Sequence, residues 1–229
     1  MIMKVISFSL WGDKKIYQVG SIRNAKMAKE VYPDFQCWFY IHVDTVPKET
    51  ISKLKEFDNV KIIEKSGDLY SMKPMTWRFE AIDSPEVELM MSRDVDTQIL
   101  IREVFAVDEW IKSGKLLHIM RDHPWHSYRI QGGMFGVRKS DITWVDKIES
   151  HCEKGNYNYD QIFLRDIIYP LYKDNCIIHA SFNKLEGPEI CCDFPMKLED
   201  DDYRFVGEYV YEDGSRNEKN TMEIKRGYI

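Results

Sequence analysis

Short apolar runs alternate with segments of helical periodicity through the first half of the chain. Runs rich in β-branched and aromatic residues predict buried strands, whereas apolar residues three or four positions apart predict amphipathic helices. Strands are expected at 5–9, 36–43, 60–63 and 86–92, and helices at 19–32, 48–57, 75–82 and 97–113. This order predicts an α/β, Rossmann-like fold with a mostly parallel central sheet and helices on both faces.

The second half of the chain is less regular. Its pattern predicts strands at 116–120, 132–137 and 176–179 and a helix at 159–169. There is no internal repeat, no low-complexity linker and no clear boundary. We therefore expect one domain over residues 1–208, followed by a polar C-terminal extension at 209–229.

Two carboxylates, Asp94 and Asp96, directly follow the expected strand at 86–92. Residues at this spacing in an extended chain point the same way. Carboxylate oxygens are the ligands that Mg²⁺ and Mn²⁺ prefer, and these ions commonly bridge a protein to substrate phosphates. The motif alone also fits a solvated loop or a helix cap, because 31% of the residues are charged and such triplets arise by chance.

The composition argues against several other classes of protein. A net charge of −6 argues against non-specific binding of nucleic acid. Five cysteines without a Cys-x-x-Cys pair disfavour a disulfide framework or a zinc site, so a reducing compartment is expected. No apolar run reaches the roughly 20 residues of a transmembrane helix, and the N-terminus lacks the order of a signal peptide. These features predict a cytoplasmic protein with no transmembrane segment.

Several polar groups are candidates for binding a phosphorylated ligand. Lys73 and Arg78 lie in or beside the expected helix before the carboxylates and suit phosphate oxygens, although charges on a helix are often only solvated. Gly132 and Gly133 would let a sugar lie against the backbone, or permit a bulge. Asp160 begins an expected helix, where it is a candidate general base or only an N-terminal cap.

The segment at 121–126 is dense in groups that bind hydroxyls. Asp122, His123 and His126 are candidates for contacts with a sugar donor or acceptor, and Asp122 and His123 are the reserve candidates for catalysis. A proline-stiffened surface loop is the alternative. Zinc is disfavoured because no second pair of Cys or His follows the His-x-x-His spacing.

Taken together, the motifs resemble a known family. They occur at 7–12, 93–96, 107–110, 118–124, 132–136, 159–161 and 205–208. In this order they resemble small glycosyltransferases of the A-type fold, in particular the capsid-decorating glycosyltransferase domains of large algal DNA viruses and similar bacterial sequences. The resemblance covers roughly residues 3–208.

This resemblance implies a nucleotide-sugar donor, with uridine diphosphate as the nucleotide, and Mn²⁺ or Mg²⁺ as the cofactor. It implies transfer of a hexosyl or deoxyhexosyl group to a hydroxyl of a glycan or glycoprotein. If the protein is viral, its location would be the host cytoplasm. Two rivals remain: a nucleotide-sugar-binding module without turnover, and a metal-dependent nucleotidyltransferase. The second usually needs a glycine-rich or basic phosphate loop, which residues 10–15 lack.

The resemblance also assigns roles to individual residues. Ser9, Leu10, Trp11 and Tyr17, at and after the first strand, would contact the base and ribose. His179 would complete the metal shell with Asp94 and Asp96, or would be an ordinary core histidine. Arg93 would touch the donor or would position the aspartates through an ion pair.

Overall fold

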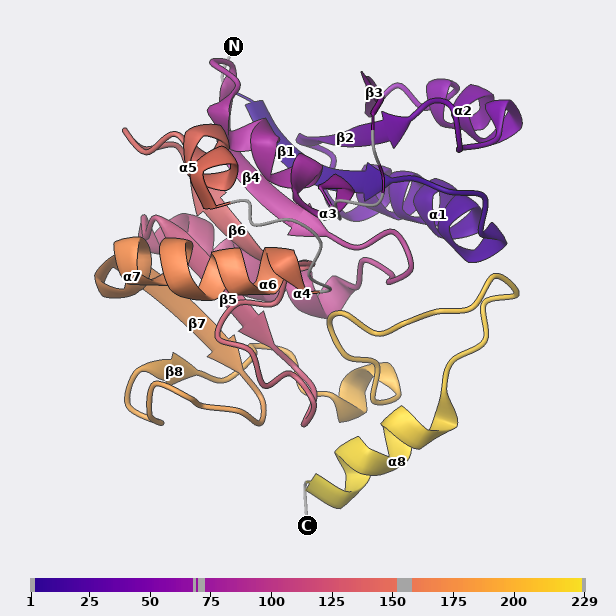
Figure 1. Cartoon of the computed structure of the whole chain (residues 1–229). Helices are drawn as coiled ribbons and strands as arrows, with labels where there is room; N and C mark the ends of the chain where they lie inside the picture. The colour runs from indigo at the N-terminus through magenta and orange to yellow at the C-terminus, as the bar shows by residue number, and fades with distance from the viewer. Residues whose placement is uncertain (1–2, 68, 70–72, 152–157, 228–229) are drawn as a thin grey trace.

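An eight-stranded sheet runs through the centre of the protein in the order β3-β2-β1-β4-β6-β5-β7-β8 (Figure 1). The structure is a computed structural model that describes residues 3–67, 69, 73–151 and 158–227. The strands are β1 (Met3–Leu10), β2 (Phe35–His42), β3 (Val60–Lys65), β4 (Val87–Arg93), β5 (Leu117–Arg121), β6 (Met134–Arg138), β7 (Cys176–Ala180) and β8 (Cys191–Cys192). Strand β6 is antiparallel to both of its neighbours, and all other pairs are parallel.

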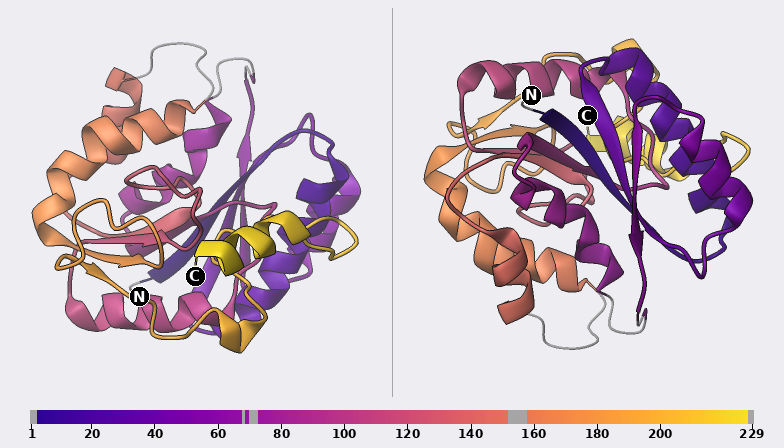
Figure 2. Two further views of the ribbon diagram at one scale, coloured as in Figure 1. Left: turned by 90° about the horizontal axis from the view of Figure 1, so that it is seen from below. Right: turned by 90° about the horizontal axis from the view of Figure 1, so that it is seen from above.

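Helices cover both faces of this sheet, as Figure 2 shows. One face carries α1 (Lys15–Val31), α2 (Lys48–Lys55) and α4 (Ile101–Ser113). The other face carries α3 (Pro74–Trp77), a 3₁₀ turn (Arg78–Asp83), α5 (Trp144–His151), α6 (Tyr159–Phe163) and α7 (Tyr169–Tyr172). The remaining helix, α8 (Glu218–Gly227), packs through Ile224 on a small separate cluster. Within the described ranges, none of the helices has the length and apolar character that crossing a bilayer requires.

Alternation along β1 divides its side chains between the two layers. Ile6, Phe8 and Leu10 belong to the core beneath α1 and α4, whereas Val5 belongs to the core on the opposite face. By the same period of two, Ser7 and Ser9 face the side of α3. The strand therefore ends with a polar side chain directed to one layer and an apolar side chain buried in the other.

The predicted α/β, Rossmann-like architecture is confirmed, but some helix boundaries differ. The helix expected at 97–113 begins at Ile101, because Asn24 of α1 bonds to the backbone of Thr97 and Ile99 and holds it out of the helix. The helix expected at 75–82 is α only as far as Trp77 and then tightens into the 3₁₀ turn. The helix expected at 159–169 contains a π-helical segment, Leu164–Ile168, between α6 and α7.

Helix α5 was not predicted, and its start depends on a distant residue. The backbone N–H groups of Trp144 and Val145 donate to the carboxylate of Asp83 at 2.9 and 2.7 Å. A side chain that caps a helix from 61 positions away leaves no local sequence signal. Trp144 then buries its whole ring among Phe79, Phe135 and Phe163, which anchors α5 to the sheet.

Candidate functional site

The two aspartates of the motif lie where β4 opens into a loop, beside the carboxyl end of β1. The register pairs Ser7 with Ser92, so the two strands deliver their following residues to the same edge of the sheet. Asp94 and Asp96 are both partly exposed, whereas Val95 between them is buried. The loop thus turns both carboxylates outward while its middle residue anchors it to the core.

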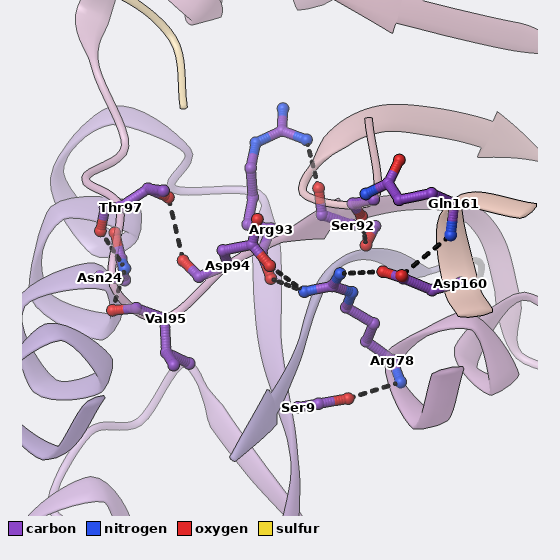
Figure 3. A network of polar contacts seen from close by, with 11 residues as sticks. Ser9, Asn24, Arg78, Ser92, Arg93, Asp94, Val95, Thr97, Asp160 and Gln161 are labelled. Atoms are coloured by element: carbon purple, nitrogen blue, oxygen red, sulfur yellow. Dashed lines mark hydrogen bonds and ion pairs between the residues drawn. The ribbon is translucent and has the colours of Figure 1, made fainter. Parts of the chain in front are cut away.

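Arg78 connects three of the elements that meet at this edge (Figure 3). Its guanidinium donates to the carboxylate of Asp94 and, at 3.2 Å, to that of Asp160. Its backbone N–H donates to Ser9 Oγ at 3.0 Å. Because the Arg78 side chain is only 8% exposed, this cation is fixed between two carboxylates rather than solvated. Of the three cations proposed from the sequence, Lys73, Arg78 and Arg93, Arg78 is therefore the one whose side chain lies at the site.

These groups line a cleft of about 520 Å³. Its lining comes from the ends of β1 and β4, from the start of α1, from Met75 and Arg78, and from the start of α6. The lining residues are Ser9, Trp11, Gly12, Asp13, Lys14, Tyr17, Met75, Arg78, Asp94, Val95, Asp96, Asn158, Asp160 and Gln161. A cleft of this volume, at the carboxyl edge of a mostly parallel sheet, is where such folds bind ligands.

The electrostatics of the cleft favour a bound cation. Burial, and then the negative charge of Asp94, raise the pKa of Asp96 to about 6. Burial also raises the pKa of Asp160, while the nearby Arg78 partly opposes that rise. Crowded carboxylates whose ionised forms are disfavoured are relieved when a divalent cation binds between them.

Gly132 and Gly133 are needed because the chain passes directly against these carboxylates. A Cβ atom on Gly133 would lie 2.0 Å from Asp94 Oδ2, and one on Gly132 would lie 2.5 Å from Asp160 Oδ2. The carbonyl of Gly132 accepts a hydrogen bond of 2.6 Å from Ser92 Oγ, which ties this turn to the end of β4. The structure thus gives both glycines a steric role at the edge of the cleft.

The donor set fits a hard cation that shares its ligands with a substrate. The described residues contain no group of three or more His, Cys, Asp or Glu side chains suited to hold a metal ion. Mg²⁺ and its analogues are often held by one or two carboxylates, with phosphate oxygens and water completing the shell. Asp94 and Asp96 would therefore need further oxygen ligands, from a bound ligand or from water, to hold such an ion.

His179 is not brought to these aspartates. It lies on β7, which two strands separate from β4 in the sheet. Its Nδ1 lies 2.9 Å from His118 Nε2, and its Nε2 lies 3.0 Å from a carboxylate oxygen of Glu109. Both ring nitrogens are engaged and the side chain is fully buried, so the structure places His179 in the core.

Three other candidates also lie away from the cleft. Leu10 is buried in the core beneath α1. Arg93 turns inward, where it pairs with Glu103 at 3.0 Å and donates to the carbonyls of Ser92 and Phe135. Lys73 lies beside a different hollow of about 450 Å³, which Trp77 and Glu80 also line. For Arg93 the structure therefore shows an ion pair with Glu103 inside the protein, and neither Leu10 nor Lys73 lines the cleft.

The polar side chains at 121–123 are buried and form hydrogen bonds inside the protein. Asp122 is fully buried, accepts two hydrogen bonds from Arg102 at 2.7 and 2.9 Å, and accepts a third from the N–H of Val206. His123 is 2% exposed and contacts the carbonyl of Asn220 at 3.3 Å. His126 Nδ1 accepts from the N–H of Asp122. Asp122 and His123 thus contact Val206 and Asn220, respectively, and do not line the cleft.

Comparison with known proteins places the fold. No protein-family model matches the sequence, and no curated protein matches it. Among solved structures, the chain is similar to a glycosyltransferase involved in glycosylation of the major capsid of PBCV-1, at 14% identity and a TM-score of 0.50, over 99% of this chain and 100% of that one. The resemblance stated from the motifs is therefore confirmed for the fold: the chain has the α/β architecture of A-type glycosyltransferases.

Two further structures have lower TM-scores. An active-site mutant of LgtC has 10% identity and a TM-score of 0.49, over 79% of this chain and 74% of that one. The 4-diphosphocytidyl-2C-methyl-D-erythritol synthase of Anaerococcus prevotii has 15% identity and a TM-score of 0.47, over 72% of this chain and 85% of that one.

Proposed function

We propose that the protein is a metal-dependent glycosyltransferase that moves a sugar from a uridine diphosphate donor to a hydroxyl of a glycan or glycoprotein. The observation that carries this proposal is the cleft where Asp94, Asp96, Arg78 and Asp160 meet at the carboxyl edge of the sheet. The shared fold with a capsid glycosyltransferase supports it. Two carboxylates that could hold a metal ion and a fixed cation suit the departure of a diphosphate, and a further buried carboxylate suits removal of the acceptor proton.

The residues divide the reaction between them. The chemistry that an Mn²⁺ or Mg²⁺ ion held by Asp94 and Asp96 supplies is neutralisation of the leaving diphosphate. Arg78 adds a second positive charge that bonds to phosphate oxygens. The acceptor oxygen attacks the anomeric carbon and the bond to the diphosphate breaks, with its electron pair leaving on the diphosphate. The proton of the acceptor hydroxyl passes to Asp160, because burial raises its pKa above that of an ordinary aspartate and so makes its carboxylate more basic.

The nucleotide would occupy the part of the cleft nearest α1. Trp11 and Tyr17 line this part, and either ring offers a flat face on which a base can stack. Lys14 lies 5.6 Å from the centre of the Tyr17 ring and adds a positive charge at the same end of the cleft. The aromatic end therefore suits the base and ribose, and the carboxylate end suits the diphosphate.

Product analysis tests this proposal directly. Incubation with a panel of uridine diphosphate sugars, with water as the acceptor, is expected to release uridine diphosphate and free sugar when Mn²⁺ is present and not when the metal is chelated. The reason is that two carboxylates without a cation repel the diphosphate they must bind. Release of pyrophosphate in a parallel incubation with a nucleoside triphosphate and a sugar phosphate would indicate a nucleotidyltransferase instead. Stabilisation of the protein against thermal unfolding by the donors without release of any product would indicate a binding module.

Selectivity for uridine gives a second prediction. We expect uridine diphosphate to bind at least about tenfold more tightly than guanosine diphosphate, a difference of about 1.4 kcal/mol, because the family resemblance implies uridine and because Trp11 and Tyr17 line the end of the cleft assigned to the base. Calorimetry with both nucleotides in the presence of Mn²⁺ measures it. Trp11→Ala should reduce the difference. Equal affinities in the unaltered protein would remove uridine from the proposal.

A further inference from the structure

We infer that Asn24, in the middle of helix α1, is a positioning residue that fixes the backbone of the loop carrying Asp94 and Asp96. We call residues 94–99 the carboxylate loop. The inference rests on the proposed function of that loop, and it assigns a role to a residue that touches neither the nucleotide nor the metal. It also explains why the two carboxylates hold one arrangement although their charges repel each other.

The side chain of Asn24 forms hydrogen bonds with the backbone of the carboxylate loop, and Figure 3 shows those to Val95 and Thr97. Its Nδ2 donates to the carbonyl of Thr97 at 2.8 Å and to that of Val95 at 3.4 Å. Its Oδ1 accepts from the N–H of Ile99 at 3.0 Å. Asn24 is fully buried, so water cannot take over these bonds when the side chain is removed. The backbone groups on both sides of Asp96 are thereby tied to one helix.

The same face of α1 also lies close to this loop at Gly20. Gly20, one turn before Asn24, lies so close that a Cβ atom would stand 2.0 Å from the carbonyl oxygen of Val95. Residues four positions apart share one face of a helix. Gly20 therefore allows α1 to approach the loop closely, and Asn24 forms hydrogen bonds with the loop backbone. Together the two residues fix the position of the loop against α1.

A second contact holds the loop from outside. The carbonyl of Asp96 accepts from the N–H of Val210 at 3.0 Å, and Thr97 forms an isolated bridge with Tyr209. Arg23, next to Asn24, donates to the carbonyl of Tyr211 at 2.7 Å. The carboxylate loop is therefore enclosed between helix α1 and the segment that follows residue 208, and adjacent residues of α1 bind both.

The test compares two asparagines that bond to backbone. Asn24→Ala removes the bonds to the carboxylate loop. The matched control is Asn59→Ala: the Asn59 side chain donates at 3.0 Å to the carbonyl of Ala25, on the same helix, and the structure gives it no bond to the loop. For each protein we would measure hydrogen exchange of the amides at 95–99, and the affinity for uridine diphosphate with and without Mn²⁺.

We expect Asn24→Ala to speed exchange of the Ile99 amide at least about tenfold and to lower the gain in affinity due to Mn²⁺ about tenfold. Asn59→Ala should leave both unchanged. A residue that only stabilises the fold would lower the melting temperature without changing the Mn²⁺-dependent gain. Equal loop exchange and equal gain in the two variants would overturn the inference.

The proposed function can fail separately. If the unaltered protein shows no Mn²⁺-dependent binding, the proposed function is wrong, and the exchange of the loop amides alone then decides whether Asn24 positions the loop. If Asn24→Ala does not fold, Asn24→Ser provides the same comparison, because it keeps a polar group but cannot reach both Thr97 and Ile99.

Discussion

Asp94→Asn and Asp96→Asn are each expected to abolish the Mn²⁺-dependent binding of uridine diphosphate and to lower transfer by about 10³-fold or more, the loss expected when several kcal/mol of charge stabilisation disappears. The amide keeps the shape of the carboxylate but not its charge. The two carboxylates are the acidic pair at this strand end, and no third metal-binding side chain completes a group among the described residues. Loss of either one therefore leaves too few ligands.

The fold should survive both changes. Each side chain is partly exposed, and the repulsion between the two carboxylates is removed with either charge. Without metal, the melting temperature of Asp96→Asn should equal or exceed that of the unaltered protein, whereas that of Asp94→Asn should fall, because the buried Arg78 loses one of its two carboxylates. Asp58→Asn is a suitable control, since Asp58 is exposed, pairs only with Lys29 among the ion pairs described, and lies away from the cleft. Unchanged Mn²⁺-dependent affinity in both variants of the motif would rule out the metal site.

Much of the fold was predictable because the apolar pattern follows the layers. The strand pattern before Asp94 and the helical pattern between the first strands each reflect burial on a sheet or on one helix face. The position of Asp94 and Asp96 at a strand end follows from that pattern and from the position of the pair. Leu10 was instead expected to contact the base and ribose, although alternation along β1, which directs Ser9 to one face and Leu10 to the other, already indicated its burial.

Other features depend on strand order and long-range contacts, which local patterns do not contain. His179 was expected at the metal because the family resemblance implied a late histidine in the metal shell, but β6 and β5 lie between β7 and β4. Asp122 looks like a polar loop residue in the sequence, yet Arg102 reaches it from α4 and buries the pair. Asn24 was missed too. Its only signal is an amide among the buried positions of an amphipathic helix, beside Ala25 and Ala28.

The second large effect is expected at Asp160. Its side chain is almost completely buried, one oxygen accepts from Arg78 at 3.2 Å, and the other accepts from the N–H of Gln161 at 2.9 Å. These bonds allow two roles. Asp160 takes the proton of the acceptor hydroxyl, or it only orients Arg78 toward the diphosphate.

Asp160→Asn and Arg78→Gln separate these roles. If Asp160 is the base, Asp160→Asn should lower turnover by roughly 10² to 10⁴ while the donor still binds with near-normal affinity. The melting temperature should fall only slightly, because the amide still accepts from one partner. Arg78→Gln should weaken binding of the diphosphate, because it removes a charge that meets phosphate oxygens.

The deciding measurement is therefore how each variant divides its loss between donor affinity and turnover. If Asp160 only orients Arg78, both variants should lose affinity together and to a similar extent. Near-normal turnover in Asp160→Asn would exclude Asp160 as the base. The other candidates for the base, Asp122 and His123, are buried in contact with Val206 and Asn220 and do not line the cleft. The proton would in that case have to leave with the departing diphosphate, whose oxygens gain negative charge as the bond to the sugar breaks.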